Sequence, residues 1–152
     1  MLHTLNVELA TRHASTMPEN VSFEHDKSVS RKVGSAESNR RRAIAYCDGL
    51  IDILSAYFNV SGRAIRSPKR QNLDVARVRQ IGMYVANVAL GINMTMIGQG
   101  FGRNKSTVVH ACHLIEDMRD DEEFDLLIAR LEAITHAAFK FTLAEQDCEA
   151  EL

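Results

Sequence analysis

Apolar side chains recur at helical spacing in several separate stretches of the chain, and the first stretch spans residues 36–58. Its apolar positions repeat every three or four residues, as on one face of a helix. They are Ile44, Cys47, Leu50, Ile51, Leu54, Tyr57 and Phe58. Ser35 or Ser38 is placed to cap this helix at its N-terminus. We therefore expect one long amphipathic helix that ends before the sequence "NVSGR".

A second helix is predicted after Asp74, which is a favourable N-cap residue. Its expected buried stripe consists of Val75, Val78, Ile81, Val85 and Val88. The opposite stripe consists of Arg77, Gln80, Tyr84 and Asn87. Gly91 is expected to end the helix.

Three further helical segments are expected in the second half of the chain. Asn93 can cap a short helix that ends between Gly98 and Gly102, and Asn104 can cap the helix after it. The core face of that next helix comprises Val108, Ala111, Cys112, Ile115 and Met118. The final helix begins near residue 120, with one apolar side made of Phe124, Leu127, Ile128, Leu131, Ile134 and Ala138. No strand-like alternation of useful length is present, so the fold class is predicted to be all-α.

The two ends of the chain differ from this helical region. Residues 1–35 are polar and without sustained periodicity, which predicts a flexible N-terminal arm with a short helical turn near residues 5–13. Residues 36–140 form the predicted helical domain, and residues 141–152 an acidic C-terminal tail. Inside the domain, "RAIRSPKRQN" contains Pro68 and indicates either a loop or a short helix followed by a loop.

Charge is distributed unevenly along the chain, although the net charge is only −2. Residues 61–110 carry eight basic side chains and one acidic one, whereas residues 111–152 carry three basic and twelve acidic ones. A basic middle segment of this kind indicates either a polyanionic partner or a solvated charged surface.

The remaining composition excludes several classes of protein. Cys47, Cys112 and Cys148 form no CxxC pair, which argues against a disulfide framework and against a zinc site. His110, Cys112 and His113 lack a further ligand pair, so we predict no metal. The apolar runs are too short to cross a membrane, and the N-terminus lacks signal-peptide features, so we expect a cytoplasmic, nucleoid-associated protein.

A short helix and a longer one, joined by a glycine-containing turn, make a helix-turn-helix within residues 74–118. The second helix of such a pair lies in the DNA major groove, with its first residues at the base edges. That role explains why "GRNKST" places so many hydrogen-bonding side chains at the start of one helix.

Two long stretches, "VARVRQIGMYVA" and "MIGQGFGRNKSTVVHACHLIE", resemble the C-terminal DNA-binding domain of the bacterial replication initiator DnaA. The resemblance covers about residues 55–135. It implies a helix-turn-helix bundle of the Trp-repressor-like type with a preceding long helix. The DnaA family reads F-G-G-R-D-H-T-T-V where this chain reads "FGRNKSTVV", so one glycine is absent.

The resemblance implies two sets of DNA-contacting residues. The expected base contacts are Arg103, Asn104, Lys105, Ser106, Thr107 and, in the minor groove, Gln71. An Asn suits adenine and a Lys suits guanine, so the departures at residues 104 and 105 predict a variant of the DnaA box. The expected contacts to the backbone or groove edge are Lys69, Arg70, Arg77, Arg79, Gln80, Asn87 and His110. Arg40, Arg41 and Arg42 form either a further phosphate contact or a solvated helix start.

The chain contains no GxxxxGK[ST] loop, so we predict no ATP binding, no cofactor and a stand-alone domain without the AAA+ module. No nucleophile–base pair or paired carboxylates are recognisable, so no enzyme is predicted. We expect a sequence-specific double-stranded DNA-binding protein that regulates transcription or modulates chromosomal replication. The alternative is an interaction protein that binds the initiator, another partner or itself (as a homodimer) through the apolar face of the helix at 36–58.

Overall fold

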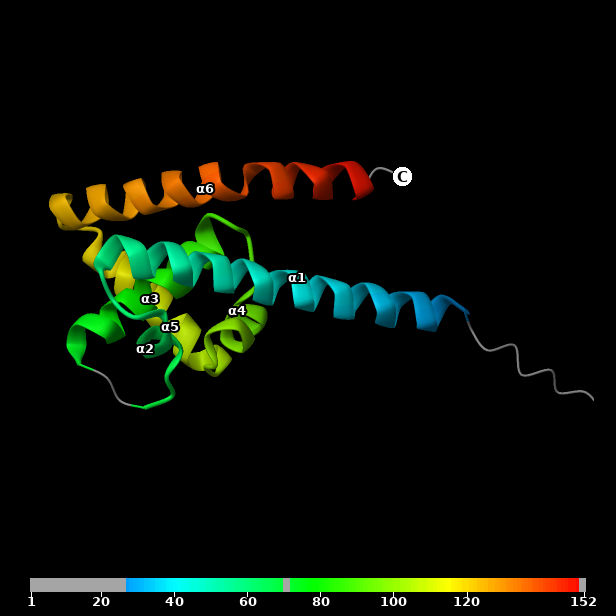
Figure 1. Cartoon of the computed structure of the whole chain (residues 1–152), viewed down its shortest axis with the longest axis horizontal. Coiled ribbons are helices and arrows are strands. Elements are labelled where there is room, and N and C mark those ends of the chain that lie inside the picture. The colour runs from blue at the N-terminus through cyan, green and yellow to red at the C-terminus, as the bar shows by residue number, and fades with distance from the viewer. Residues whose placement is uncertain (1–26, 70–71, 151–152) are drawn as a thin grey trace, which may run out of the picture.

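The computed structural model describes residues 27–69 and 72–150, and those residues form helices and connecting turns without a strand (Figure 1). The helices are α1 (Lys27–Phe58), α2 (Gly62–Arg66), α3 (Leu73–Val88), α4 (Met94–Phe101), α5 (Lys105–Met118) and α6 (Glu122–Ala150). The predicted all-α class is confirmed. The residues predicted to form the arm before Lys27, together with Arg70 and Gln71, lie outside the described part of the chain.

Helix α1 begins earlier than the sequence pattern indicated. It starts at Lys27, so neither Ser35 nor Ser38 is its N-cap. Its C-terminal half packs on α3 and α4, whereas its N-terminal half projects beyond the body of the molecule (Figure 1). The helix ends at Asn59, which adopts the left-handed conformation at φ 52°. Asn tolerates this conformation better than most residues, and so suits a sharp helix end.

The apolar face of α1 is buried in the domain's own core. Its buried members are Ala43, Tyr46, Cys47, Leu50, Ile51 and Leu54, and only Tyr57 of the predicted face is well exposed. The alternative hypothesis required this face to be available to a partner or to a second copy of the chain. The structure uses that surface internally, where the side chains are removed from water.

Helix α3 is the central helix of the bundle and contacts α1, α4, α5 and α6. Its N-cap is Asn72, whose side chain accepts a hydrogen bond from Val75 N at 3.1 Å, so the prediction of Asp74 as the cap was wrong. Asp74 lies in the first turn of α3, where its negative charge interacts favourably with the helix dipole. Of the stripe predicted to face outward, Tyr84 is 5% exposed and so belongs to the core.

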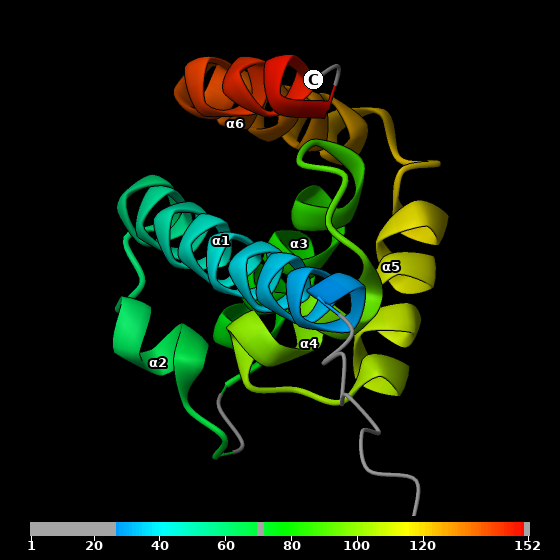
Figure 2. The same cartoon turned by 90° about the vertical axis from the view of Figure 1, so that its right-hand side faces the viewer.

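Helix α6 lies beside α1 and runs in the opposite direction (Figures 1 and 2). Phe139 meets Tyr46 of α1 edge-to-face, with ring centroids 5.4 Å apart. The predicted apolar side of α6 is only partly correct, because Ile128 and Leu131 are buried while Ile134 and Ala138 are exposed. The helix extends to Ala150, so it includes most of the segment predicted to be an acidic tail.

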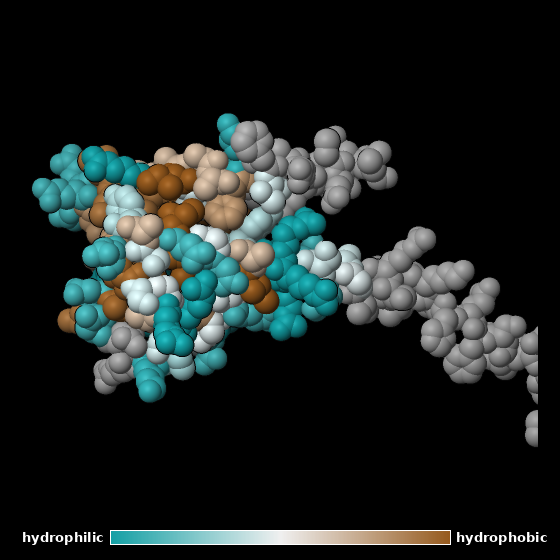
Figure 3. Space-filling model, viewed as in Figure 1, coloured by the Kyte–Doolittle hydropathy of each residue, from teal (hydrophilic) through white to brown (hydrophobic). Residues whose placement is uncertain are grey.

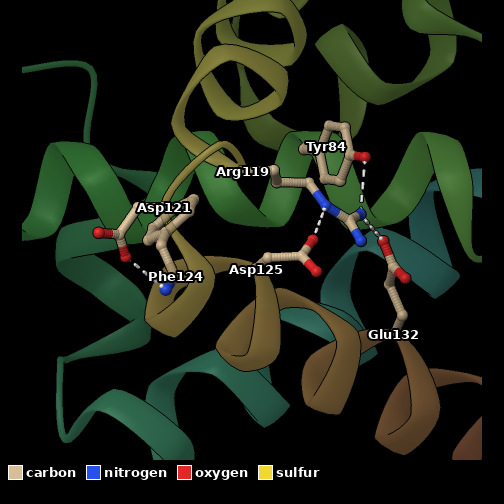
Figure 4. A network of polar contacts seen from close by, with 6 residues as sticks. All are labelled: Tyr84, Arg119, Asp121, Phe124, Asp125 and Glu132. Atoms are coloured by element: carbon tan, nitrogen blue, oxygen red, sulfur yellow. Dashed lines mark hydrogen bonds and ion pairs between the residues drawn. The ribbon is translucent and has the colours of Figure 1, made fainter.

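Arg119, at the end of α5, joins α6 to α3 through a polar network (Figure 4). Its guanidinium donates to the Tyr84 hydroxyl at 3.0 Å, to Glu132 at 2.7 Å and to Asp125. Burial lowers the pKa of Arg119, but the hydrogen bonds to Asp125 and Tyr84 and the charge of Glu132 raise it by more. The guanidinium therefore stays charged and links three helices.

Candidate nucleic-acid interface

The turn between α4 and α5 is tight because two glycines permit it. Gly102 adopts the left-handed conformation at φ 62°, which costs little without a side chain. The Arg103 amide then donates to the Gly98 carbonyl at 2.7 Å. A Cβ atom on Gly98 would lie 2.6 Å from the Arg103 carbonyl oxygen, so this position has no room for a side chain. The two helices are thereby held in the helix-turn-helix arrangement predicted from the sequence.

The first turn of α5 presents polar side chains to solvent while the opposite side of the helix is buried. Its exposed residues are Asn104, Lys105, Ser106, Thr107 and His110. Its buried residues are Val108, Ala111, Cys112 and Ile115. The segregation gives α5 a polar edge that is accessible at its N-terminus.

Asn104 occupies the N-cap position of α5, but its side chain makes no capping hydrogen bond. Asn72 and Asn93, by contrast, both accept such a bond from the helices that they start. The expected side-chain cap is therefore found at Asn93 and is absent at Asn104. The amide of Asn104 remains available for another partner, and an amide can pair with an adenine edge.

Arg103 points toward the loop that follows α2. Its Nη2 donates to the Ser67 carbonyl oxygen at 2.6 Å, and its Nη1 to the Gly102 carbonyl at 3.3 Å. The side chain is half-buried. This geometry ties the start of α5 to residues 67–69 after α2, here called the basic loop. This role differs from the base contact expected for Arg103.

Arg79, which the resemblance placed at the DNA backbone or groove edge, is 8% exposed. Nε donates to the Ile65 carbonyl at 2.6 Å, and Nη2 donates to the carbonyls of Ala64 and Ser67 at 3.0 and 3.3 Å. These carbonyls lie at the C-terminal end of α2, where the helix supplies few donors; the Ser67 amide donates to the Ala64 carbonyl at 3.3 Å. Burial, and then the nearby charge of Arg103, lower the pKa of Arg79.

The Ser67 carbonyl therefore accepts from two arginines that lie far apart in the sequence. Sequence reasoning missed this joint. A signal was present for Arg79, because Val75, Arg79, Gly82 and Ala86 follow one helical stripe and all are buried. Nothing in the sequence pointed to Ser67.

The basic loop lies on the same side of the molecule as the start of α5 (Figure 2). The basic loop follows the short helix α2. Of the two alternatives for "RAIRSPKRQN", a short helix followed by a loop is therefore the correct one. Lys69 is exposed there, beside Arg63 and Arg66. Arg66 is paired with Asp48 at 3.0 Å, which leaves it less available to an anion than Lys69.

The other α3 residues expected at the DNA are half-buried. Asn87 donates to the Ile92 carbonyl at 3.0 Å and so holds the turn between α3 and α4. Arg77 has a buried Nη1 without a hydrogen-bond partner among the described residues. A buried cationic donor without a partner is costly, so an incoming acceptor would stabilise it. Gln80 lies one helical turn further along α3.

The described residues hold neither a metal-binding cluster nor a membrane-spanning helix. No group of three or more His, Cys, Asp or Glu side chains is placed to hold a metal ion there. Cys112 is buried whereas His110 and His113 are exposed, so these three side chains do not converge. None of the described helices is long and apolar enough to span a membrane.

This geometry agrees with a comparison to known families. Residues 47–115 match the model of the bacterial DnaA protein helix-turn-helix. This segment therefore resembles a DnaA-type helix-turn-helix domain in sequence as well as in fold. The match includes the buried face of α1, the basic loop, α3 and the helix pair α4–α5.

Curated relatives of the DnaA-type segment are chromosomal replication initiator proteins DnaA. The protein from Lachnoclostridium phytofermentans is 34% identical over 90 residues, which cover 55% of this chain and 20% of that protein. The protein from Agrobacterium fabrum is 34% identical over 94 residues, covering 61% of this chain and 18% of that protein. The chain thus matches about a fifth of the length of these relatives.

A solved structure shares the fold. It is the replication initiator DnaA bound to AMPPCP and single-stranded DNA, with a TM-score of 0.55 and 21% sequence identity. The superposition covers 74% of this chain and 32% of that one. The likeness therefore extends beyond residues 47–115 and supports the arrangement of the helices around them.

Proposed function

We propose that this chain binds double-stranded DNA sequence-specifically, with the first turn of α5 in the major groove. The observation that carries the proposal is the exposed polar edge of α5, fastened to the basic loop by Arg103 and Ser67. A rigid link between a base-reading turn and a backbone-gripping loop positions both on one duplex. The match to the DnaA helix-turn-helix supports the same assignment.

The proposed base contacts are Asn104, Lys105, Ser106 and Thr107, with Gln71 in the minor groove. Asn can bond adenine through two hydrogen bonds, and Lys can donate to guanine O6 and N7. Because both residues differ from the family pattern at the reading positions, we propose that the target is a variant of the DnaA box. Arg103 and Arg79 act as positioning residues for the turn and the loop.

The proposed backbone contacts are Lys69, Arg70, Arg77, Gln80, Asn87 and His110. Each neutralised phosphate adds about 0.9 to the log–log slope of affinity against salt. Lys69, Arg70 and Arg77 are the cations in this set, so their three contacts predict a log–log slope of about 2.7.

The biological role that follows is regulation of transcription or modulation of chromosomal replication, at the nucleoid in the cytoplasm. The proposal assigns the chain no catalytic step, no ATP and no cofactor. DNA binding is favoured over the alternative partner role because the apolar face of α1 lies in the core.

The experiment is selection of bound duplexes from a random-sequence pool, followed by sequencing. The wild-type chain is expected to enrich one short site. The variant Asn104→Ala with Lys105→Ala should enrich a different or weaker pattern, and Arg130→Ala on the exposed surface of α6 should enrich the wild-type site. Equal enrichment by the double variant and the wild-type chain would reject the proposal.

A further inference from the structure

A groove lies between residues 36–40 of α1, the helix α4 and the start of α5. It is lined by polar side chains and by Met94 and Met96. The polar members are Glu37, Arg40, Asn87, Asn93, Thr95, Gln99 and Lys105. Since Lys105 belongs to both the groove and the polar edge of α5, the groove continues the proposed DNA surface away from the base-reading turn.

Arg40 is held at this groove by a contact between α1 and α4. Its Nε donates to Gln99 Oε1 at 2.8 Å, although the two residues are 59 positions apart. Its Nη1 lies 3.7 Å from Glu37, beyond hydrogen-bonding distance, and its side chain is 51% exposed. Gln99 therefore holds Nε of Arg40, and the half-exposed guanidinium lines the groove beside Glu37.

The surface of α1 is hydrophilic where the helix leaves the body of the molecule (Figure 3). Arg40 and Lys105 supply two positive charges to the groove, against one carboxylate from Glu37. Asn93 and Thr95 add neutral hydrogen-bonding groups, and Met94 and Met96 add apolar lining. An anionic phosphate joined to an apolar sugar matches this combination.

We propose that Arg40 binds a phosphate of the duplex beyond the site read by α5, so that α1 forms part of the DNA interface. The inference rests on the proposed DNA binding. The sequence left two roles open for Arg40, Arg41 and Arg42, namely a phosphate contact or a solvated helix start. The inference assigns the phosphate contact to Arg40 and not to Arg41. Arg41 does not line the groove, is 79% exposed and pairs with Glu37.

The test measures affinity by fluorescence anisotropy at several salt concentrations, using the full chain and the duplex enriched from the random pool. Arg40→Ala should lower the log–log salt slope by about 0.9, the value of one phosphate contact. Arg41→Ala is the matched control, because it removes the same charge from the same helix outside the groove, and its slope should stay close to wild type. On a duplex shortened at the α1 side, wild type and Arg40→Ala should have equal slopes.

Two further variants separate a direct contact from a structural one. Gln99→Ala removes the partner of Arg40 but not its charge, so its slope should remain wild type. Glu37→Gln removes the opposing carboxylate and should raise the affinity, a gain that misfolding cannot produce.

Three outcomes would overturn the inference. The first is an Arg40→Ala slope equal to wild type, while the wild-type chain binds its selected duplex with steep salt dependence; only the role of Arg40 then fails. The second is an equal loss of slope in Gln99→Ala and Arg40→Ala, which would make Arg40 a support for α4. The third is a wild-type chain that binds no duplex, which would remove the proposed function as well.

Discussion

The resemblance placed Arg79 and Arg103 at the DNA. In the structure, both direct their guanidinium groups toward the protein's own backbone. Arg79 and Arg103 share the Ser67 carbonyl, and together they join α2, α3 and the turn before α5. A buried carbonyl that loses its donor costs about 1–3 kcal/mol. At the scale of single residues, these two side chains therefore set the spacing between the loop and the reading turn.

Replacement of Arg79 distinguishes this role from a phosphate contact. Arg79→Met should lower the free energy of unfolding by about 2 kcal/mol, because three carbonyls lose a charged donor. Urea unfolding followed by circular dichroism measures the loss, and anisotropy at several salt concentrations measures the slope. An unchanged stability with a slope reduced by about 0.9 would instead restore the phosphate contact.

The exposed residues at the start of α5 should show the opposite behaviour. Lys105→Ala should leave the unfolding free energy within about 0.5 kcal/mol of wild type, as for other exposed positions. It should weaken binding to the selected duplex by about 5- to 150-fold if Lys105 makes one base contact. If Lys105 contacts a base, Lys105→Ala should lose affinity for the selected duplex but not for a scrambled one.

At the scale of helices, most of the fold follows from the periodicity of apolar residues. The remainder depends on contacts between helices that are far apart in the sequence. The apolar stripes of α1 and α5 predicted most of their buried faces, because one side of each helix packs on the core. Ile134 and Ala138 of α6 broke that pattern, because the face of α6 that meets the core there runs through Leu131, Thr135 and Phe139. The N-cap of α3 is Asn72 and not the predicted Asp74, because the helix begins at Leu73 and the Asn72 side chain accepts a hydrogen bond from Val75 N.

The turn between α4 and α5 gives a prediction at this scale. Gly98→Ala places a Cβ within 2.6 Å of the Arg103 carbonyl oxygen, and overpacking of this kind costs about 1–3 kcal/mol. DNA affinity should fall as well, because the start of α5 must move. Gly34→Ala is the control, since Gly34 is exposed with open space around it, and it should stabilise α1 by roughly 0.5–1 kcal/mol. Equal unfolding midpoints for the two variants would contradict the packing argument.

At the scale of the whole molecule, charge and function are segregated. The basic loop and the start of α5 lie on one side, whereas α6 lies on the opposite side (Figure 2). The sequence showed this division as a basic middle segment and an acidic C-terminal segment. The long-range joints at Ser67 and Gln99 were not predictable, because a single carbonyl or amide leaves no periodic signal.

The network around Arg119 should determine how firmly α6 is attached. Arg119→Met removes hydrogen bonds to Tyr84, Asp125 and Glu132 and should cost about 1–3 kcal/mol of unfolding free energy. Amide hydrogen exchange should show the greatest loss of protection in α6. Arg130→Met, on the exposed side of α6, should change stability by less than about 0.5 kcal/mol. A loss of protection spread evenly over all helices would argue against a local attachment.

The most direct measurement is the ratio of affinities for the selected duplex and for a scrambled duplex of equal length and composition, at physiological salt. Specific DNA-binding proteins prefer their sites by about a thousandfold or more, so we predict at least that ratio for the wild-type chain. The variant Asn104→Ala with Lys105→Ala should bring the ratio down while affinity for the scrambled duplex changes little. A wild-type ratio close to one would contradict the claim that the first turn of α5 reads DNA sequence.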